Sequence, residues 1–310
     1  MTTPLLSIVV PCYNEEGSIA ALAARLDAVL GDYKTQGTEI LLVDDGSADG
    51  TWPAIEKLCA KDAGVIGVRL SRNFGHQMAL ACGLDHARGR RVLVIDADLQ
   101  DPPELLPAMI KKMDEGFDVV YGKRRSRQGE GGFKKASAWV YYRLLGRLSE
   151  VPIPPEAGDF RLMSRRAVDA LIALPERIRF TRGLVAWLGF RQAAVEYTRE
   201  ARHAGETHYP LRAMLRFANE GITSFSTRPL QLATWLGLLM MMVSIGLLGY
   251  VFLSWLLFDT VRGWTSLAAI FLLSQAAQWL MLGIIGNYLA VMFREVKARP
   301  LYLIDRTLNR

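Results

Sequence analysis

The sequence predicts an α/β domain with a mostly parallel sheet, followed by a membrane-embedded C-terminal part. Two observations lead to this prediction. Short aliphatic runs alternate with segments of helical periodicity through the first part of the chain, and two later segments contain no charged residue. Strands that alternate with helices of about ten or more residues imply right-handed crossovers and a parallel sheet covered on both faces. The hydrophobic content of 51% is high for a water-soluble protein.

The first 121 residues contain the most regular part of this pattern. Strands are expected where aliphatic and β-branched residues form short runs, and helices where apolar residues recur every three or four positions. The predicted strands are 5–10, 38–43, 65–70, 92–95 and 117–121. The predicted helices are 18–30, 52–60, 75–87 and 104–115. Pro102 and Pro103 force the chain to turn before the last of these helices.

The pattern becomes less regular after residue 121. A proline-rich joint occupies residues 151–155. We expect it to be followed by a helix at 178–188, a strand at 193–197, a polar loop at 198–209 and an amphipathic helix at 211–225.

Two long segments lack Asp, Glu, Lys and Arg altogether. Residues 229–258 and 263–293 are each about thirty residues long, against the roughly twenty needed to cross a bilayer core. We therefore predict two transmembrane helices; the alternative, a buried hairpin in a soluble core, would have shorter helices with a polar stripe. Basic residues lie before the first segment and after the second, whereas the loop between them holds only Asp259 and Arg262. The positive-inside rule then puts both ends of the chain in the cytoplasm.

Several protein classes are disfavoured by the remaining composition. The N-terminus has no basic region and no small-residue cleavage site, so no signal peptide is expected. Cys12, Cys59 and Cys82 lack metal-ligand spacing and are expected to be reduced core thiols. The net charge of +6 is modest, and no nucleic-acid partner is expected. No G-x-G-x-x-G follows the first strand and no G-x-x-x-x-G-K-[ST] occurs, which disfavours a dinucleotide-binding domain and a P-loop.

The segment 91–104 is the centre of the predicted site, because a buried strand ends there in two aspartates. Asp96 and Asp98 follow the strand, and Gln100 adds an amide oxygen. Open α/β sheets bind ligands at the carboxyl ends of their strands. Oxygen ligands without histidine or cysteine suit Mg2+ or Mn2+, ions that usually hold a diphosphate. We therefore predict a metal site here, although so short a motif taken alone also fits a solvated strand end or a helix cap.

Other acidic residues follow neighbouring strands. Glu15 comes after the first strand, and Asp44 and Asp45 come after the second. Uncompensated carboxylates at one edge of a sheet raise each other's pKa values unless a cation or a hydrogen-bonding ligand binds there. The set therefore favours a metal together with a sugar nucleotide, in which Tyr13 stacks on a base and Asp45 accepts from uracil or ribose. For each residue alone, solvation or helix capping is an equally good interpretation.

Eight motifs occur in a fixed order over nearly the whole chain: PCYNEE, VDDGSADGT, SRNFGHQMAL, DADLQDPPE, YGKRRSR, GDFRLMSR, FTRGLVAWLGF and RHAGETHYP. This series resembles family 2 glycosyltransferases of the GT-A fold. It is most similar to the polyprenyl-phosphate glycosyltransferases, which include dolichyl-phosphate mannose synthases and bactoprenol glucosyltransferases. The resemblance implies a Rossmann-like nucleotide-diphospho-sugar transferase domain, interfacial amphipathic helices and two C-terminal transmembrane helices.

The resemblance also implies roles for particular residues. The nucleotide-sugar contacts of the family fall on Pro11, Tyr13, Glu15, Val43, Asp45, Asp96, Ala97 and Asp98. Its metal ligands fall on Asp98 and Gln100, with Asp96 beside them. Arg124 matches a catalytic arginine near the phosphates. Asp159 returns to the active site and is the candidate for a base or an acceptor-orienting carboxylate.

The segment 123–135 is basic and rich in glycine. It contains Arg124, Arg127 and Lys134, and the following helix at 136–148 has the aromatic residues typical of an interfacial helix. Guanidinium groups match phosphate geometry, so this segment is predicted to bind the phosphate of a lipid acceptor at the membrane surface. A solvated loop beside a packed helix is the alternative.

The loop 202–208 departs from the family pattern. Arg202 matches a family arginine on a loop that folds over the donor, but the lysine usual six residues later is His208 here. Imidazole has an unperturbed pKa near 6.5 and is mostly neutral at cytosolic pH. We therefore expect weaker or pH-dependent binding of the donor diphosphate, unless His208 only packs near Tyr209.

These expectations combine into one function. The chain would be a metal-dependent, inverting hexosyltransferase that moves a sugar from a nucleotide diphosphate to undecaprenyl or another polyprenyl phosphate, for modification of a cell-envelope glycan. UDP-glucose is the expected donor by resemblance, ahead of GDP-mannose and a modified amino sugar. A processive polysaccharide synthase would show Q-x-x-R-W, but the chain has no Arg-Trp pair. A non-enzymatic nucleotide-binding scaffold would have lost one of the motifs.

The expected organisation has four parts. Residues 1–209 form a cytoplasmic GT-A catalytic domain with an interfacial helix near 134–148. The rest comprises an amphipathic juxtamembrane helix at 210–228, a two-helix transmembrane domain at 229–293 and a basic cytoplasmic tail at 294–310. The sequence leaves open whether the chain forms a homo-oligomer.

Overall fold

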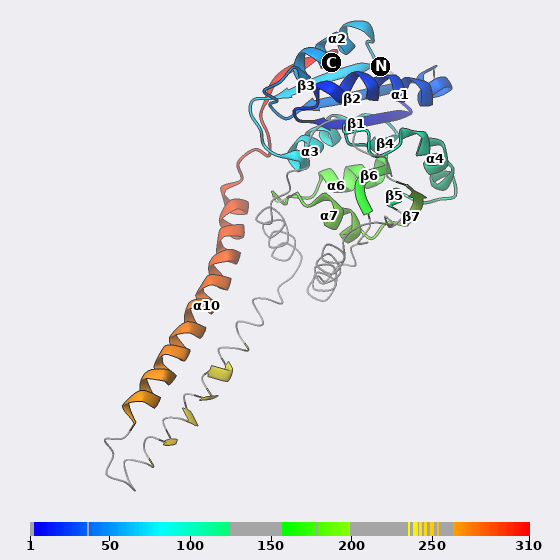
Figure 1. Ribbon diagram of the computed structural model, residues 1–310. Coiled ribbons are helices and arrows are strands. Elements are labelled where there is room, and N and C mark those ends of the chain that lie inside the picture. Colours follow the sequence, from blue (N-terminus) through cyan, green and yellow to red (C-terminus); the bar gives the residue numbers. More distant parts are fainter. Residues whose placement is uncertain are drawn as a thin grey trace.

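The computed structural model describes most of the chain (Figure 1). The described residues are 3–35, 37–124, 157–177, 179–198 and 263–310, together with single residues and short runs between 235 and 253. The predicted interfacial helix near 134–148 and the juxtamembrane helix at 210–228 lie outside them.

A single sheet of eight strands forms the centre of the fold, in the order β7-β5-β6-β4-β1-β2-β3-β8. The strands are β1 (Leu6–Cys12), β2 (Thr38–Asp44), β3 (Val65–Leu70), β4 (Arg91–Val94), β5 (Val119–Arg124), β6 (Ala157–Ser164), β7 (Gln192–Tyr197) and β8 (Ile304–Leu308). β1 pairs in parallel with β2 and β4, and β2 pairs in parallel with β3. β6 runs antiparallel between β4 and β5, and β8 runs antiparallel to β3. The sheet is therefore mixed but mostly parallel.

Helices cover both faces of this sheet. They are α1 (Glu16–Thr35), α2 (Thr51–Lys61), α3 (His76–His86), α4 (Leu106–Asp114), α6 (Arg165–Ile172) and α7 (Thr181–Trp187), with a 3-10 turn at Pro103–Leu105. One core contains residues of α1, α2 and α4, such as Leu22, Ile55 and Met109. The other contains residues of α3, α6 and α7, such as Leu80 and Val168. Strands β1 and β2 lie between the two cores, which explains their nearly continuous apolar sequences.

The predicted elements of the first 121 residues are confirmed to within a few residues, whereas two strands were not predicted. In β6, Asp159 and Arg161 alternate with Phe160 and Leu162. All four residues are buried, so two charged residues lie in the interior of the sheet, where hydrophobic pattern predicts apolar residues. β8 lies in the expected basic tail. It is short, and most of its residues are exposed. Residues Ile304–Leu308 of this segment therefore contribute an edge strand to the sheet.

The final residues are attached to the domain by several hydrogen bonds. The Asn309 side chain donates to the carbonyl groups of Cys59 and Val65 at 2.6 and 2.9 Å. The Tyr302 hydroxyl donates to Asp85 of α3 at 2.7 Å. These contacts hold the C-terminus beside α2 and β3 (Figure 1).

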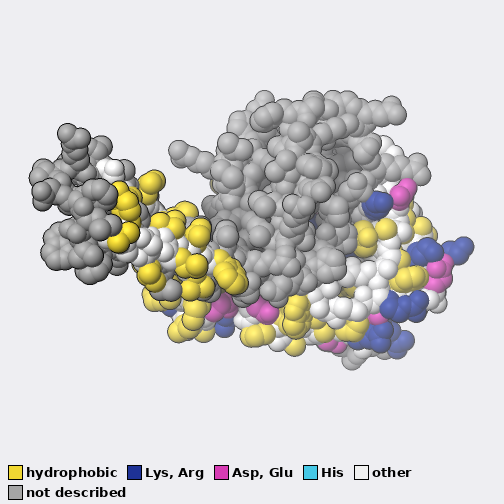
Figure 2. Space-filling model, turned by 90° about the horizontal axis from the view of Figure 1, so that it is seen from below, with side chains coloured by type: hydrophobic (Ala, Val, Ile, Leu, Met, Phe, Trp, Pro, Cys, Tyr) yellow, Lys and Arg dark blue, Asp and Glu magenta, His cyan; other side chains and the backbone are white. Residues whose placement is uncertain are grey.

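A long helix, α10 (Trp264–Lys297), extends away from the domain (Figure 1). Its segment Leu273–Lys297 is long and apolar enough to cross a membrane, the one such helix in the described part of the chain. Its hydrophobic side chains, among them Phe271, Trp279 and Leu282, are exposed along this arm (Figure 2). The first predicted span, 229–258, lies largely outside the described residues, so two transmembrane helices are not confirmed.

Candidate active site

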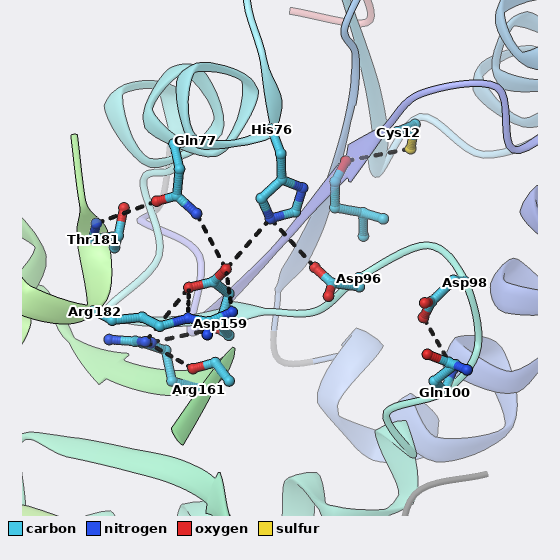
Figure 3. A network of polar contacts seen from close by, with 12 residues as sticks. Cys12, His76, Gln77, Asp96, Asp98, Gln100, Asp159, Arg161, Thr181 and Arg182 are labelled. Atoms are coloured by element: carbon cyan, nitrogen blue, oxygen red, sulfur yellow. Dashed lines mark hydrogen bonds and ion pairs between the residues drawn. The ribbon is translucent and has the colours of Figure 1, made fainter. Parts of the chain in front are cut away.

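The sheet register brings together two acidic residues that are far apart in the sequence. β4 and β6 are antiparallel neighbours, and Val94 pairs with Arg161. Asp96 therefore leaves β4 at the same edge of the sheet at which Asp159 enters β6. The first residues of α3 and α7 lie over this edge and add His76, Gln77 and Arg182 (Figure 3).

Asp159 is the centre of a polar network (Figure 3). Its side chain is only 4% exposed. Arg182 donates to both carboxylate oxygens, from Nε at 3.1 Å and from a terminal nitrogen at 3.2 Å. Gln77 Nε2 donates at 3.1 Å, and His76 Nε2 lies 3.5 Å from Oδ2. A terminal nitrogen of Arg161 lies 3.7 Å from Oδ1, so three cationic side chains surround one carboxylate.

The pKa values follow from these charges. Burial alone would raise the pKa of Asp159, but the charge of Arg182 and the hydrogen bond from His76 outweigh burial and hold this pKa well below its usual range. Burial alone would lower the pKa of His76, but Asp159 and Asp96 together raise it to about 9. Burial lowers the pKa of Arg161 to about 10, which leaves it charged at neutral pH. Asp159 is therefore a permanent anion whose charge is already compensated.

Asp96 is in the opposite situation. Burial raises the pKa of Asp96 to about 6; the charge of His76 opposes this rise, and the neighbouring carboxylates of Asp159, Asp101 and Asp98 add to it. Its Oδ1 lies 3.6 Å from His76 Nε2 and accepts no hydrogen bond within the described part of the chain. Without a further cation, this carboxylate is under-compensated.

Asp98 and Gln100 lie on a tight turn after β4. Their side chains are largely buried, and the Gln100 backbone N–H donates to Asp98 Oδ1 at 3.1 Å. Leu99 between them has a φ of 60°, in the left-handed region. Figure 3 shows Asp98 and Gln100 close together, whereas Asp96 points toward His76. The described residues contain no group of three His, Cys, Asp or Glu side chains arranged to hold a metal. The donor chemistry of Asp98 and Gln100 nevertheless fits a hard divalent cation.

The carboxyl ends of β1 and β2 and the residues that follow them line the neighbouring part of the sheet edge. Pro11 and Val43 are paired in register, and the Tyr13 side chain beyond them is half exposed. Asp45 accepts hydrogen bonds from the backbone N–H groups of Phe74 and Gly75, at 2.7 and 2.8 Å. Asp45 therefore fixes the loop that leads to His76 and Gln77.

Two further acidic residues of this edge also have protein partners. Asp44 pairs with Arg69 at 3.4 Å. Glu15 accepts from the Ser18 hydroxyl at 2.9 Å. Asp44 and Asp96 each lie near one cationic side chain of the chain itself, Arg69 and His76 respectively. Asp44 Oδ2 and Asp96 Oδ1 nevertheless accept no hydrogen bond from the described residues.

A family model for glycosyl transferase family 2 matches residues 7–172 of this chain. The chain belongs to that family. The YkcC glycosyltransferase of Bacillus subtilis (strain 168), whose own activity is uncharacterized, is 46% identical over 97% of this chain and 93% of its own length. The prophage bactoprenol glucosyl transferase homolog of Escherichia coli (strain K12) is 38% identical over 97% of this chain and 98% of its own length. These relatives support assignment of the chain as a hexosyltransferase.

The fold agrees with this assignment. A crystal structure of S. aureus TarS (residues 1–349) in complex with UDP-GlcNAc superposes with a TM-score of 0.50 and 21% sequence identity, and the match covers 71% of this chain and 65% of that 1–349 chain. The GT-A fold expected for a family 2 glycosyltransferase is thus confirmed.

Four polar residues of this family 2 site were not assigned a role from the sequence: His76, Gln77, Arg161 and Arg182. Each lies in a motif that carried the resemblance, SRNFGHQMAL, GDFRLMSR or FTRGLVAWLGF. The motifs mark these segments as characteristic, but no spacing rule indicates that His76, Gln77 and Arg182 meet Arg161 at Asp159. Only the packing of α3 and α7 against the edge of β6 brings them there.

Several predicted site residues lie where the structure does not describe their side chains. Arg124 is the last residue of β5, and only its backbone is described. Arg127, Lys134, Arg202 and His208 lie outside the described residues. Ala97, between the two aspartates, is buried.

Proposed function

We propose that this chain is a metal-dependent, inverting glycosyltransferase that moves a hexose from a nucleoside diphosphate to a polyprenyl phosphate. One observation carries the proposal: the similarity to bactoprenol glucosyl transferases spans 97% of the chain and so includes both the sheet and the apolar helix α10. A glucosyl donor, UDP-glucose, and undecaprenyl phosphate are the proposed substrates. The product would be a lipid-linked sugar for cell-envelope glycan modification.

Asp98 and Gln100 are the proposed ligands of Mg2+ or Mn2+, with Asp96 joining them after a turn away from His76. Bound there, the cation would neutralise charge on the departing nucleoside diphosphate. The pKa of Asp96 is raised first by burial and further by neighbouring carboxylates, and a bound cation would offset both effects. The nucleotide would lie along the ends of β1 and β2, near Pro11, Tyr13, Glu15, Val43, Asp45 and Ala97.

The acceptor needs little help to become a nucleophile. A phosphate monoester has a second pKa of about 6 and is largely dianionic at neutral pH. Its oxygen forms a bond to the anomeric carbon, the bond from that carbon to the diphosphate oxygen breaks, and the electron pair leaves with the nucleoside diphosphate. Attack from the face opposite the nucleotide inverts the anomeric centre, and no proton has to be removed.

In this proposal Asp159 is an anchor and not a general base. A carboxylate whose pKa is held far below its usual range is a weak base. Its two hydrogen bonds instead hold the Arg182 guanidinium at the site, where this group is proposed to bind phosphate oxygens as well. Arg124, Arg127 and Lys134 are the proposed ligands of the acceptor phosphate. Arg202 and His208 are proposed to close over the donor.

The proposed membrane arrangement agrees with a lipid acceptor. Helix α10 would be one of two spans, with residues 1–209 and both termini on the cytoplasmic side of the inner membrane. The contacts of Glu295 and Arg299 with Arg177 keep the cytoplasmic end of this helix close to the domain. A polyprenyl chain in the bilayer would thus have its phosphate within reach of the site.

Transfer of label from UDP-[14C]glucose into organic-extractable lipid tests the proposal. The full chain in membranes, with Mn2+ and undecaprenyl phosphate, should produce labelled lipid, and chelation of the metal should abolish it. Other nucleotide sugars should be screened in the same assay. Label in a water-insoluble polymer would indicate a processive synthase instead, and no transfer from any donor of the panel would contradict an enzymatic function.

A further inference from the structure

The turn that carries Asp98 and Gln100 has an unfavourable backbone. Leu99 adopts φ 60°, a conformation that places the Cβ of an L-residue too close to the following carbonyl oxygen. The residue is 4% exposed, so its side chain is fixed in the core. Such a conformation persists only where surrounding contacts hold it.

One of these contacts is made by the next acidic residue. The Asp101 side chain is fully buried, and its Oδ1 accepts a hydrogen bond from the Tyr197 hydroxyl. Tyr197 is the last residue of β7, an edge strand of the sheet, and is only 5% exposed. The hydrogen bond therefore joins the turn after β4 to a strand that is three places away in the sheet.

The ring of Tyr197 is itself held in place. It packs edge-on against Phe160, with the ring centroids 5.9 Å apart. Gly122 of β5 makes room for both rings, since a Cβ at this position would lie 2.8 Å from Tyr197 and 2.6 Å from Phe160. Phe160 lies between Asp159 and Arg161 in β6. Tyr197 thus contacts both halves of the site, the turn through its hydroxyl and the β6 strand through its ring.

We infer that Tyr197 is a positioning residue for the Asp98–Gln100 turn and sets its affinity for a divalent cation with a nucleoside diphosphate. The hydroxyl fixes Asp101, and Asp101 fixes the C-terminal end of the turn on which the two oxygen ligands lie. This inference rests on the proposed function, because it assigns Tyr197 to the metal site proposed there. Tyr197 itself does not touch the cation.

The test is calorimetric titration of UDP into the full chain in detergent, with Mn2+ and with a chelator. Tyr197→Phe removes the hydroxyl and keeps the ring, so Mn2+-dependent UDP binding should weaken about tenfold, while binding without metal should stay unchanged. Tyr302→Phe is the matched control: its hydroxyl also donates to a carboxylate, Asp85 at 2.7 Å, but far from the turn. This control should bind UDP like the wild type under both conditions.

Asp101→Asn is the second variant, because an amide oxygen can still accept from Tyr197. It should lose less Mn2+-dependent affinity than Tyr197→Phe. Wild-type affinity in Tyr197→Phe, or an equal loss in Tyr197→Phe and Tyr302→Phe, would overturn the inference and leave the proposed function intact. Absence of metal-dependent UDP binding in the wild type would instead contradict the proposed metal site, and the inference with it.

Discussion

Two groups of carboxylates lie at the same edge of the sheet in opposite electrostatic surroundings (Figure 3). Asp159 is surrounded by Arg182, Arg161 and His76, and its pKa is lowered. On the other side, Asp96 precedes the turn that carries Asp98, and burial raises the pKa of Asp96 to about 6. The chain therefore places three cationic side chains around Asp159, whereas the negative charge of Asp96 is balanced less completely.

This difference separates two roles that both belong to acidic residues. A carboxylate that is already paired with guanidinium groups orients those groups and is a weak base. Carboxylates that raise each other's pKa values favour an external cation. In the proposed reaction, the Asp98 side binds the metal and the donor diphosphate, and the Asp159 side organises cations for phosphate.

The largest effect is expected for Asp98→Asn. The amide keeps the size of the side chain but cannot offset the charge of a cation, so kcat/KM for lipid transfer should fall by about a thousandfold. Asp114→Asn is the matched control, because Asp114 is exposed and pairs with Arg91 away from the site. Near wild-type turnover of Asp98→Asn with Mn2+ would show that this residue is not a metal ligand.

A smaller effect is expected for Asp159→Asn. The amide oxygen still accepts from Arg182, but the charge that orients the guanidinium is lost, so kcat should fall by about tenfold to thirtyfold. Steady-state rates at saturating lipid phosphate and donor provide the measurement. If the loss equals that of Asp98→Asn while donor binding is intact, Asp159 acts in catalysis as a base and the division described above is wrong.

The smallest effect is expected for Gln77→Leu. Gln77 accepts a hydrogen bond from the Thr181 backbone N–H at 3.2 Å and donates one to Asp159, so it links the first residue of α7 to the Asp159 carboxylate. Loss of these hydrogen bonds should lower kcat by about threefold and leave Mn2+-dependent donor binding unchanged. Gln192→Leu also removes a hydrogen bond to the backbone, at Val185, but away from the network. If Gln77→Leu, but not Gln192→Leu, lowered the Mn2+-dependent affinity for the donor, the Asp159 network would also determine metal binding, and the separation of the two roles would be wrong.

The residues proposed to bind the metal were singled out from the sequence, whereas His76, Gln77 and Arg182, which contact Asp159, were not. Asp98 and Gln100 are close in the sequence and follow β4, whose aliphatic sequence predicts a strand. Hydrophobic pattern and the local motif are therefore sufficient to propose them as metal ligands. The partners of Asp159 come from the first residues of α3 and α7, and pair with it only because β6 runs antiparallel to β4. Periodicity carries no information about such long-range contacts.

The same distinction holds for the fold. Strands β1 to β4 are short, buried and aliphatic, and their positions follow from hydrophobic pattern. β6 and β8 have charged residues within them, Asp159 and Arg161 in one and Asp305 and Arg306 in the other. Their positions depend on which strand they pair with, which is a property of the assembled sheet.

The most direct test of the division is a comparison of donor binding by Asp98→Asn and Asp159→Asn. UDP is titrated calorimetrically into each variant and the wild type, with Mn2+ and with EDTA. We predict that Mn2+ strengthens UDP binding to the wild type and to Asp159→Asn by a similar factor, and that Asp98→Asn gains nothing from the metal. An equal Mn2+-dependent increase in UDP affinity in all three proteins, or an increase that is lost only in Asp159→Asn, would contradict the assignment of the cation to the Asp98 side.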